Sequence, residues 1–139
     1  MNEALKIENT CRMYKPSDYE LVASWWTGQK WNAVPSDMLP DLGLISIIDD
    51  KPVCAGFLYT SNSKTVWMEW VIADPNSDKQ TRALALEQLI DNLLTLAQLK
   101  KAKYVVTSVM HPKLIERLEQ KGFIKTDTNM QNMVKVLGV

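Results

Sequence analysis

The chain has 139 residues, of which 46% are apolar and 23% charged, as in an ordinary globular protein with one core. Its 16 basic and 16 acidic side chains give no net charge, which argues against binding to nucleic acid or an anionic membrane through overall electrostatic attraction. No segment approaches the roughly 20 apolar residues of a membrane span, and the N-terminus MNEALKIENT lacks the apolar run of a signal peptide. We therefore predict a single cytoplasmic domain over residues 1–139.

The first part of the chain predicts a strand and then a helix. Residues 10–14 read as a short strand that ends in a Lys-Pro turn. Ser17 and Glu20 have the spacing of a capping box, so the helix is expected to open at Ser17 and to stop near Gly28. The segment 28–43 is expected to be irregular, with one helical turn near its middle.

Three β-rich runs follow and predict an antiparallel meander. Residues 44–48 and 53–60 are apolar and lie on either side of a polar turn that contains Asp49 and Asp50. These paired carboxylates are interpreted as turn residues, because Asp favours local hydrogen bonds in turns. After a second tight turn, residues 65–73 predict the third strand of the meander.

The clearest helix comes next, because apolar residues recur there at helical spacing. Ser77 and Gln80 form a second candidate capping box, which predicts a helix beginning at Asp78. The stripe on its inner face consists of Leu86, Leu89, Ile90, Leu93, Leu94 and Ala97.

The last part of the chain predicts a buried strand, a short helix and a hairpin. Residues 104–109 form an apolar run of the buried type. A helix with Pro112 in its first turn is expected to end at Gly122. Phe123 begins the last strand, for which residues 133–137 are the candidate hairpin partner. The cysteines, Cys11 and Cys54, have no metal-ligand or redox spacing, so we expect reduced thiols and no metal site.

This order of elements resembles the GNAT superfamily of acyl-CoA-dependent N-acetyltransferases, from about residue 10 to residue 137. Two motifs carry the resemblance. Ala73-Asp74-Pro75 is similar to the family's V-x-P at the end of the fourth strand, and LIERLEQKGF (114–123) is similar to its a-l-Y-e-k-x-G-F segment. The resemblance implies an α/β GNAT fold, with a mixed central β-sheet of about six to seven strands flanked by about four helices. It also implies acetyl-CoA as the acyl donor, and similar compact chains occur in tailed bacteriophages.

The family's acyl-CoA loop, [QR]-x-x-G-x-[GA], falls on residues 78–83, where only Ala83 fits. Asp78 replaces a basic or amide residue, and Thr81 replaces the glycine that lets a backbone approach a diphosphate. Lys79 and Arg82 could hold phosphates by their side chains instead. The alternative is that this segment is only the capped, charged first turn of a helix. The resemblance assigns acyl-CoA binding to the end of the strand and to this turn: Val71, Ile72, Ala73, Lys79, Gln80, Thr81, Arg82 and Ala83.

Two side chains are candidates for proton transfer. Glu69 lies among apolar neighbours on the strand where the family usually has its base, and apolar surroundings raise the pKa of a carboxyl group. Alternatively, it is a hydrogen-bonded structural carboxylate. The family's acid is commonly a tyrosine, but the matching position holds Leu118. His111 matches an asparagine of the family and either contacts the pantetheine, carries a proton or caps the helix before Pro112.

Five tryptophans are a high count for this length. Trp26 and Trp31 lie in the segment that forms the acceptor-side wall in GNAT proteins, so they are candidates for an aromatic substrate pocket, with core packing as the alternative. Trp67 and Trp70 are expected on opposite faces of their strand, because their separation is odd.

The preferred prediction is an N-acetyltransferase in which a primary amine, from a small molecule or a protein, attacks the thioester of acetyl-CoA directly. One alternative is a GNAT-fold binding protein without catalysis, and another is a phage enzyme that modifies nucleic acid. The neutral net charge argues against nucleic acid as a partner. A monomer or a homodimer is expected, with no membrane partner.

Overall fold

The computed structural model describes residues 10–138, and the chain divides into two units, with the boundary between Ser108 and Val109. The described part of the first unit contains β1 (Cys11–Met13), the 3₁₀ turn η2 (Pro16–Asp18), α1 (Tyr19–Gly28), the 3₁₀ turn η3 (Ser36–Met38), β2 (Gly43–Ile48), β3 (Lys51–Tyr59), β4 (Thr65–Ala73), α2 (Lys79–Leu99) and β5 (Tyr104–Val106). The second unit contains α3 (Pro112–Gln120). The prediction of one domain over the whole chain stays a prediction.

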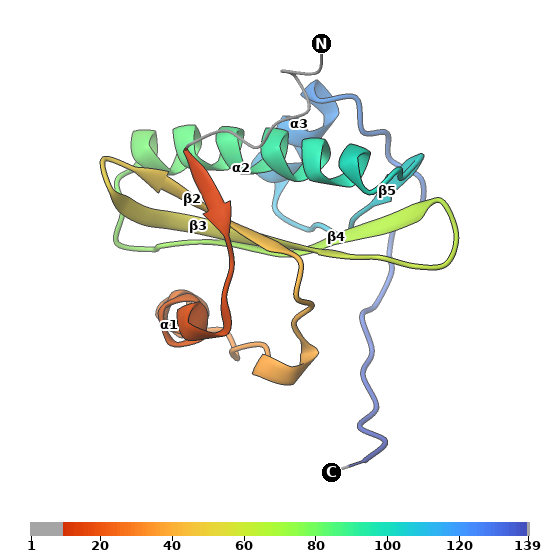
Figure 1. The fold of residues 1–139 in the computed structure, drawn as a ribbon, viewed down its shortest axis with the longest axis horizontal. Coiled ribbons are helices and arrows are strands. Elements are labelled where there is room, and N and C mark those ends of the chain that lie inside the picture. Colours follow the sequence, from red (N-terminus) through yellow and green to blue (C-terminus); the bar gives the residue numbers. More distant parts are fainter. Residues whose placement is uncertain (1–9, 139) are drawn as a thin grey trace. The chain divides into compact units, whose positions relative to one another are not determined.

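The first unit is built on one mixed sheet with the strand order β1-β2-β3-β4-β5. The first four strands pair antiparallel, and β4 pairs with β5 in parallel. A parallel neighbour needs a crossover, which α2 supplies. Figure 1 shows α2 against one face of this sheet and α1 against the other.

The α/β class and the mixed sheet agree with the sequence-based prediction, but the number of elements differs. Residues 10–138 contain five strands and three α-helices, instead of six to seven strands and about four helices. The expected last hairpin, from Phe123 and over 133–137, is not formed by strands. An apolar run becomes a strand only where a neighbour pairs its backbone groups, and no described strand pairs with these residues.

The hairpin between β2 and β3 is confirmed, with Asp49 and Asp50 as its two-residue turn. Their φ angles are 49° and 66°, both in the left-handed region. Such a pair of angles matches the twist of the flanking strands, and Asp tolerates them better than most residues. The structural interpretation of these two carboxylates is therefore confirmed.

Both predicted capping boxes are wrong by one or two residues, although both helices exist. At the first, residues Pro16–Asp18 form a 3₁₀ turn, and the Asp18 carboxylate accepts the Lys15 N–H at 2.8 Å. At the second, the Asp78 carboxylate caps α2, while the Ser77 hydroxyl donates to the carbonyl of Asp74 instead. In each case an aspartate next to the predicted serine is the stronger acceptor for a free N–H group.

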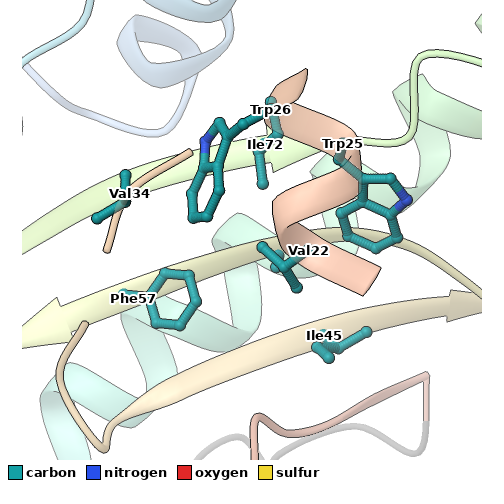
Figure 2. Packing of buried hydrophobic residues seen from close by; sticks show 8 residues of the cluster. Val22, Trp25, Trp26, Val34, Ile45, Phe57 and Ile72 are labelled. Carbon is teal, nitrogen blue, oxygen red and sulfur yellow. The ribbon is translucent and has the colours of Figure 1, made fainter. Parts of the chain in front are cut away.

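The core on the α1 side of the sheet is formed by large apolar side chains. Figure 2 shows side chains of α1 packed against Ile45, Phe57 and Ile72 of three strands. The contributions of the helix are Val22, Trp25 and Trp26, each at most 4% exposed. On the opposite face, α2 buries Leu89, Ile90 and Leu93 completely, as the apolar stripe predicts.

Candidate functional site

A β-bulge interrupts β4 near its end. Ala55 of β3 lies opposite Ile72 and Phe57 lies opposite Glu69, so that Trp70 and Val71 together face the single residue Gly56. Trp70 has a φ angle of 61°, which is unusual for a bulky side chain. A bulge leaves its extra residue without a ladder partner and bends the strand.

The bulge overturns the expectation that Trp67 and Trp70 lie on opposite faces. Trp67 is paired directly with Tyr59, which places both on one face. The indole N–H of Trp70 donates to the hydroxyl of Tyr59 at 2.7 Å, so its ring lies on that face as well. The alternation argument fails because the extra residue resets the two-residue period of the strand.

Strands β4 and β5 separate just before the bulge. Their parallel pairing covers only Thr65 to Trp67 on β4, and β5 ends at Val106. The predicted strand over 104–109 is therefore too long at its end. Beyond the pairing, the Thr107 hydroxyl donates to the carbonyl of Met68 at 2.5 Å in place of a backbone group. From this point on, β4 has no described strand beside it on the β5 side.

Glu69 lies where the two strands separate. Its carboxylate is half-buried, and its Oε1 atom is 3.4 Å from the backbone nitrogen of Ser108. Burial raises the pKa of Glu69, and the weak hydrogen bond from Ser108 lowers it only in part. The predicted environment is thus present, while the catalytic role of Glu69 stays a prediction.

The first turn of α2 is closed by its own N-cap. The Asp78 carboxylate accepts the backbone N–H of Thr81 at 2.8 Å and the Thr81 hydroxyl at 2.9 Å. These bonds lower the pKa of Asp78 and keep it ionised. The Arg82 guanidinium donates to the carbonyl of Ser77, across the loop. The side chains of Lys79 and Gln80 are exposed, and Ala83 lies partly buried on the following turn.

The Asp78 cap bears directly on phosphate binding. A helix N-terminus holds anions through free N–H groups, and here a carboxylate already accepts one of them. A diphosphate at this turn would have to displace Asp78 or bind beside it through Lys79. Val71, Ile72 and Ala73 form the end of β4, directly before this loop. Their role in acyl-CoA binding stays a prediction.

His111 lies in the second unit and is exposed. Its Nδ1 atom accepts the backbone N–H of Lys113 at 3.2 Å, so the imidazole caps α3 as the structural alternative predicts. A role in proton transfer stays a prediction.

The two tryptophans assigned to the acceptor pocket have different surroundings. Trp26 is 4% exposed inside the core, which leaves its ring to packing. Trp31 is 58% exposed and lies just beyond the end of α1. Its backbone N–H donates to the carbonyl of Trp26. Of the two, only Trp31 offers an accessible aromatic surface.

Sequence reasoning missed the residues that shape this part of the sheet. Gly56, Tyr59, Thr107 and Ser108 all contact or face the bulged end of β4. The one available signal was Gly56, because a glycine inside an apolar strand run often marks a bulge or a close approach. The contacts of the Thr107 and Tyr59 side chains and of the Ser108 backbone N–H join segments about 40 residues apart or depend on the bulge.

The described residues show neither a metal centre nor a membrane span. In residues 10–138, no group of three or more His, Cys, Asp or Glu side chains is arranged to hold a metal ion. None of the described helices combines the length and the hydropathy that crossing a membrane requires.

The comparisons place the fold. No family model matches the chain, and no curated protein matches its sequence. Among solved structures, it is similar to Ard1 from Thermoplasma volcanium (16% identity, TM-score 0.69, over 85% of this chain and 84% of that one). It is also similar to an acetyltransferase from Trypanosoma brucei (17% identity, TM-score 0.66, over 89% of this chain and 98% of that one). A protein from Mycobacterium tuberculosis, solved in complex with CoA, is similar as well (16% identity, TM-score 0.67, over 87% of this chain and 75% of that one). At these identities the likeness shows the architecture alone: the chain shares its fold with solved acetyltransferases.

Proposed function

We propose that the protein is an N-acetyltransferase that moves the acetyl group of acetyl-CoA to a primary amine of a small molecule or a protein. The observation that best supports this proposal is that the bulged end of β4 has no described strand on its β5 side and that a half-buried carboxylate, Glu69, lies where β4 and β5 separate. A fold shared with acetyltransferases is consistent with it but does not define the activity.

The end of β4 is suited to an extended ligand. Between Trp67, the last residue paired with β5, and the loop at Asp74, β4 has no described strand beside it on the β5 side. A pantetheine arm carries two amide groups, which can pair with backbone groups as an added strand does. We propose that Val71, Ile72 and Ala73 bind it in this way.

The proposed reaction needs one base and one proton source. Glu69 accepts a proton from the amine, directly or through a water molecule, so that the nitrogen lone pair is free to attack. The N–C bond forms as the C–S bond breaks, and the nitrogen releases its second proton to water. The leaving thiolate takes a proton from water, because Leu118 has no hydroxyl group. A carboxyl with a raised pKa holds the transferred proton better than an ordinary one.

The diphosphate end of the donor fits less well. The Asp78 carboxylate is fully exposed and negatively charged at the N-terminus of α2, where a diphosphate would lie. We propose that Lys79 supplies the opposite charge and that the donor binds against the repulsion of Asp78. The same feature favours a second candidate, a GNAT-fold binding protein that does not use acyl-CoA.

Isothermal titration with acetyl-CoA separates the two candidates. We expect a dissociation constant between about 1 µM and 1 mM, the usual range for enzyme substrates. An absence of heat at millimolar acetyl-CoA would contradict the transferase and leave the binding protein. With an amine acceptor identified, Glu69→Gln should lower turnover by about 10²–10⁴-fold, the usual contribution of a general base.

The Asp78→Asn variant tests the repulsion at the loop. The amide keeps an oxygen that can accept the Thr81 N–H, but it removes the negative charge. We therefore expect acetyl-CoA to bind several-fold more tightly, and Asp37→Asn, an equal charge change at an exposed position, to have no effect. Equal affinities for Asp78→Asn and the wild type would place the diphosphate elsewhere.

A bacteriophage origin, a cytoplasmic location and the monomer or homodimer state stay predictions.

A further inference from the structure

The bulge of β4 depends on a residue in an unfavourable conformation. Trp70 lies in the left-handed region with φ at 61°, where a bulky aromatic side chain is rarely found. Such conformations persist only where the surrounding structure holds them in place. The contacts of the Trp70 side chain are therefore the place to look for what maintains the bulge.

Two consecutive hydrogen bonds hold this side chain. The Trp70 indole N–H donates to the Tyr59 hydroxyl at 2.7 Å, and this hydroxyl donates to the carbonyl of Met38 at 2.6 Å. Met38 ends the 3₁₀ turn η3, in the irregular segment between α1 and β2. The Tyr59 hydroxyl thus connects the bulge to a separate part of the chain.

The register explains why the bulge is needed. Glu69 and Ile72 are three positions apart, so a regular strand would place them on opposite faces. Their partners Phe57 and Ala55 both lie on the α1 side of the sheet. The bulge places the side chains of Glu69 and Ile72 on that same side. Without it, either the core would lose Ile72 or the carboxylate of Glu69 would leave the opening beside β5.

We propose that Tyr59 is a positioning residue, whose hydroxyl holds Trp70 in the bulge and so maintains the donor-binding end of β4. The donor part of this inference rests on the proposed function, whereas the structural part does not. Tyr59 itself is not proposed to touch the reacting atoms.

Tyr59→Phe removes only the hydroxyl, and Tyr19→Phe is a matched control. The Tyr19 hydroxyl also donates to a loop carbonyl, that of Val34, at 2.7 Å, but within residues 10–138 no indole N–H donates to it. In ¹⁵N-labelled protein, we expect the Trp70 indole N–H to exchange with solvent at least tenfold faster in Tyr59→Phe and at an unchanged rate in Tyr19→Phe. We also expect acetyl-CoA to bind at least fivefold more weakly in Tyr59→Phe only.

Trp70→Gly provides the second test, because glycine adopts a positive φ without strain. In this background, adding Tyr59→Phe should not change acetyl-CoA affinity, since the hydroxyl has no indole left to hold. An indole exchange rate in Tyr59→Phe within twofold of the wild type would overturn the inference. So would equal losses of donor affinity in Tyr59→Phe and Tyr19→Phe. A wild-type protein that binds no acetyl-CoA would overturn the proposed function and the donor part, while indole exchange would still decide the structural part.

Discussion

Gly56 is the position where one added methyl group tests the packing behind the site. A Cβ atom there would lie 2.9 Å from Cδ1 of Leu93, 3.3 Å from Cδ2 of Leu89 and 3.3 Å from Cγ2 of Val71. Two of these neighbours belong to α2 and the third to the bulge, so the glycine lets helix and bulge approach β3 together. In Gly56→Ala at least Leu93 must move, although it is fully buried.

The expected cost of Gly56→Ala follows from this overlap. Overpacking by one methyl group in a dense core costs about 1–3 kcal/mol of unfolding free energy. An unfolding entropy of about 2.1 cal/mol/K per residue gives roughly 0.3 kcal/mol/K for a chain of 139 residues. The melting temperature should therefore fall by about 3–10 °C, as measured by calorimetry or circular dichroism.

Two further variants make this prediction specific. Gly138→Ala adds the same methyl group where nothing lies within 4 Å, so its melting temperature should match the wild type. Leu93→Ala alone should cost about 2–5 kcal/mol. In the double variant, the new methyl group fills part of that space, so the combined cost should be at least about 0.5 kcal/mol below the sum. A stable Gly56→Ala variant, or strict additivity with Leu93→Ala, would refute the reasoning.

Three further predictions concern charge and the hairpin turn. Burial raises the pKa of Glu69 above its ordinary 4.5, so the folded state holds a proton on this carboxyl more tightly than the unfolded state does. The free energy of unfolding should therefore fall as the pH rises through the raised pKa. Glu69→Gln should remove this pH dependence and have a higher melting temperature at neutral pH. Arg12 donates two hydrogen bonds to the Asp18 carboxylate, both at 2.9 Å, and these lower the pKa of Asp18 below 3.8. Asp18→Asn should therefore lower the free energy of unfolding by about 1–2 kcal/mol at pH 7, and its stability should approach that of the wild type in acid. Asp50→Gly relieves a φ of 66° in the two-residue turn and should add about 0.5–1 kcal/mol, measured by urea unfolding, with a loss of stability as the contradicting result.

Local patterns predicted most elements of the first unit. The apolar runs at 44–48 and 65–73 fall on β2 and β4, and the apolar stripe of α2 lies on its buried face, so these patterns are visible in the residues themselves. The exact helix starts were missed for two reasons: a 3₁₀ turn, in which Asp18 accepts the Lys15 N–H, precedes α1, and at α2 Asp78 takes the cap in place of the serine beside it. The last hairpin was predicted from the local sequence alone, and no described strand pairs with these residues.

The candidate site was predicted in part. The half-buried Glu69 beside the end of β4 agrees with its apolar neighbours in the sequence. The accessible Trp31 and the buried Trp26 could not be told apart, because both are tryptophans of one short segment and only packing distinguishes them. The Asp78 cap corresponds to the structural alternative that the same residues suggested.

The sequence alone determined most of the strands and helices of the first unit, since hydrophobic periodicity and turn residues act over a few positions. The tertiary structure decided the register of β4 against β3, where Gly56 faces two residues, and with it the common face of Trp67, Glu69 and Trp70. It also decided where β5 leaves the sheet, through the bond from Thr107 to the Met68 carbonyl. These features depend on contacts between segments far apart in the chain, and for that reason a pattern of neighbouring residues could not predict them.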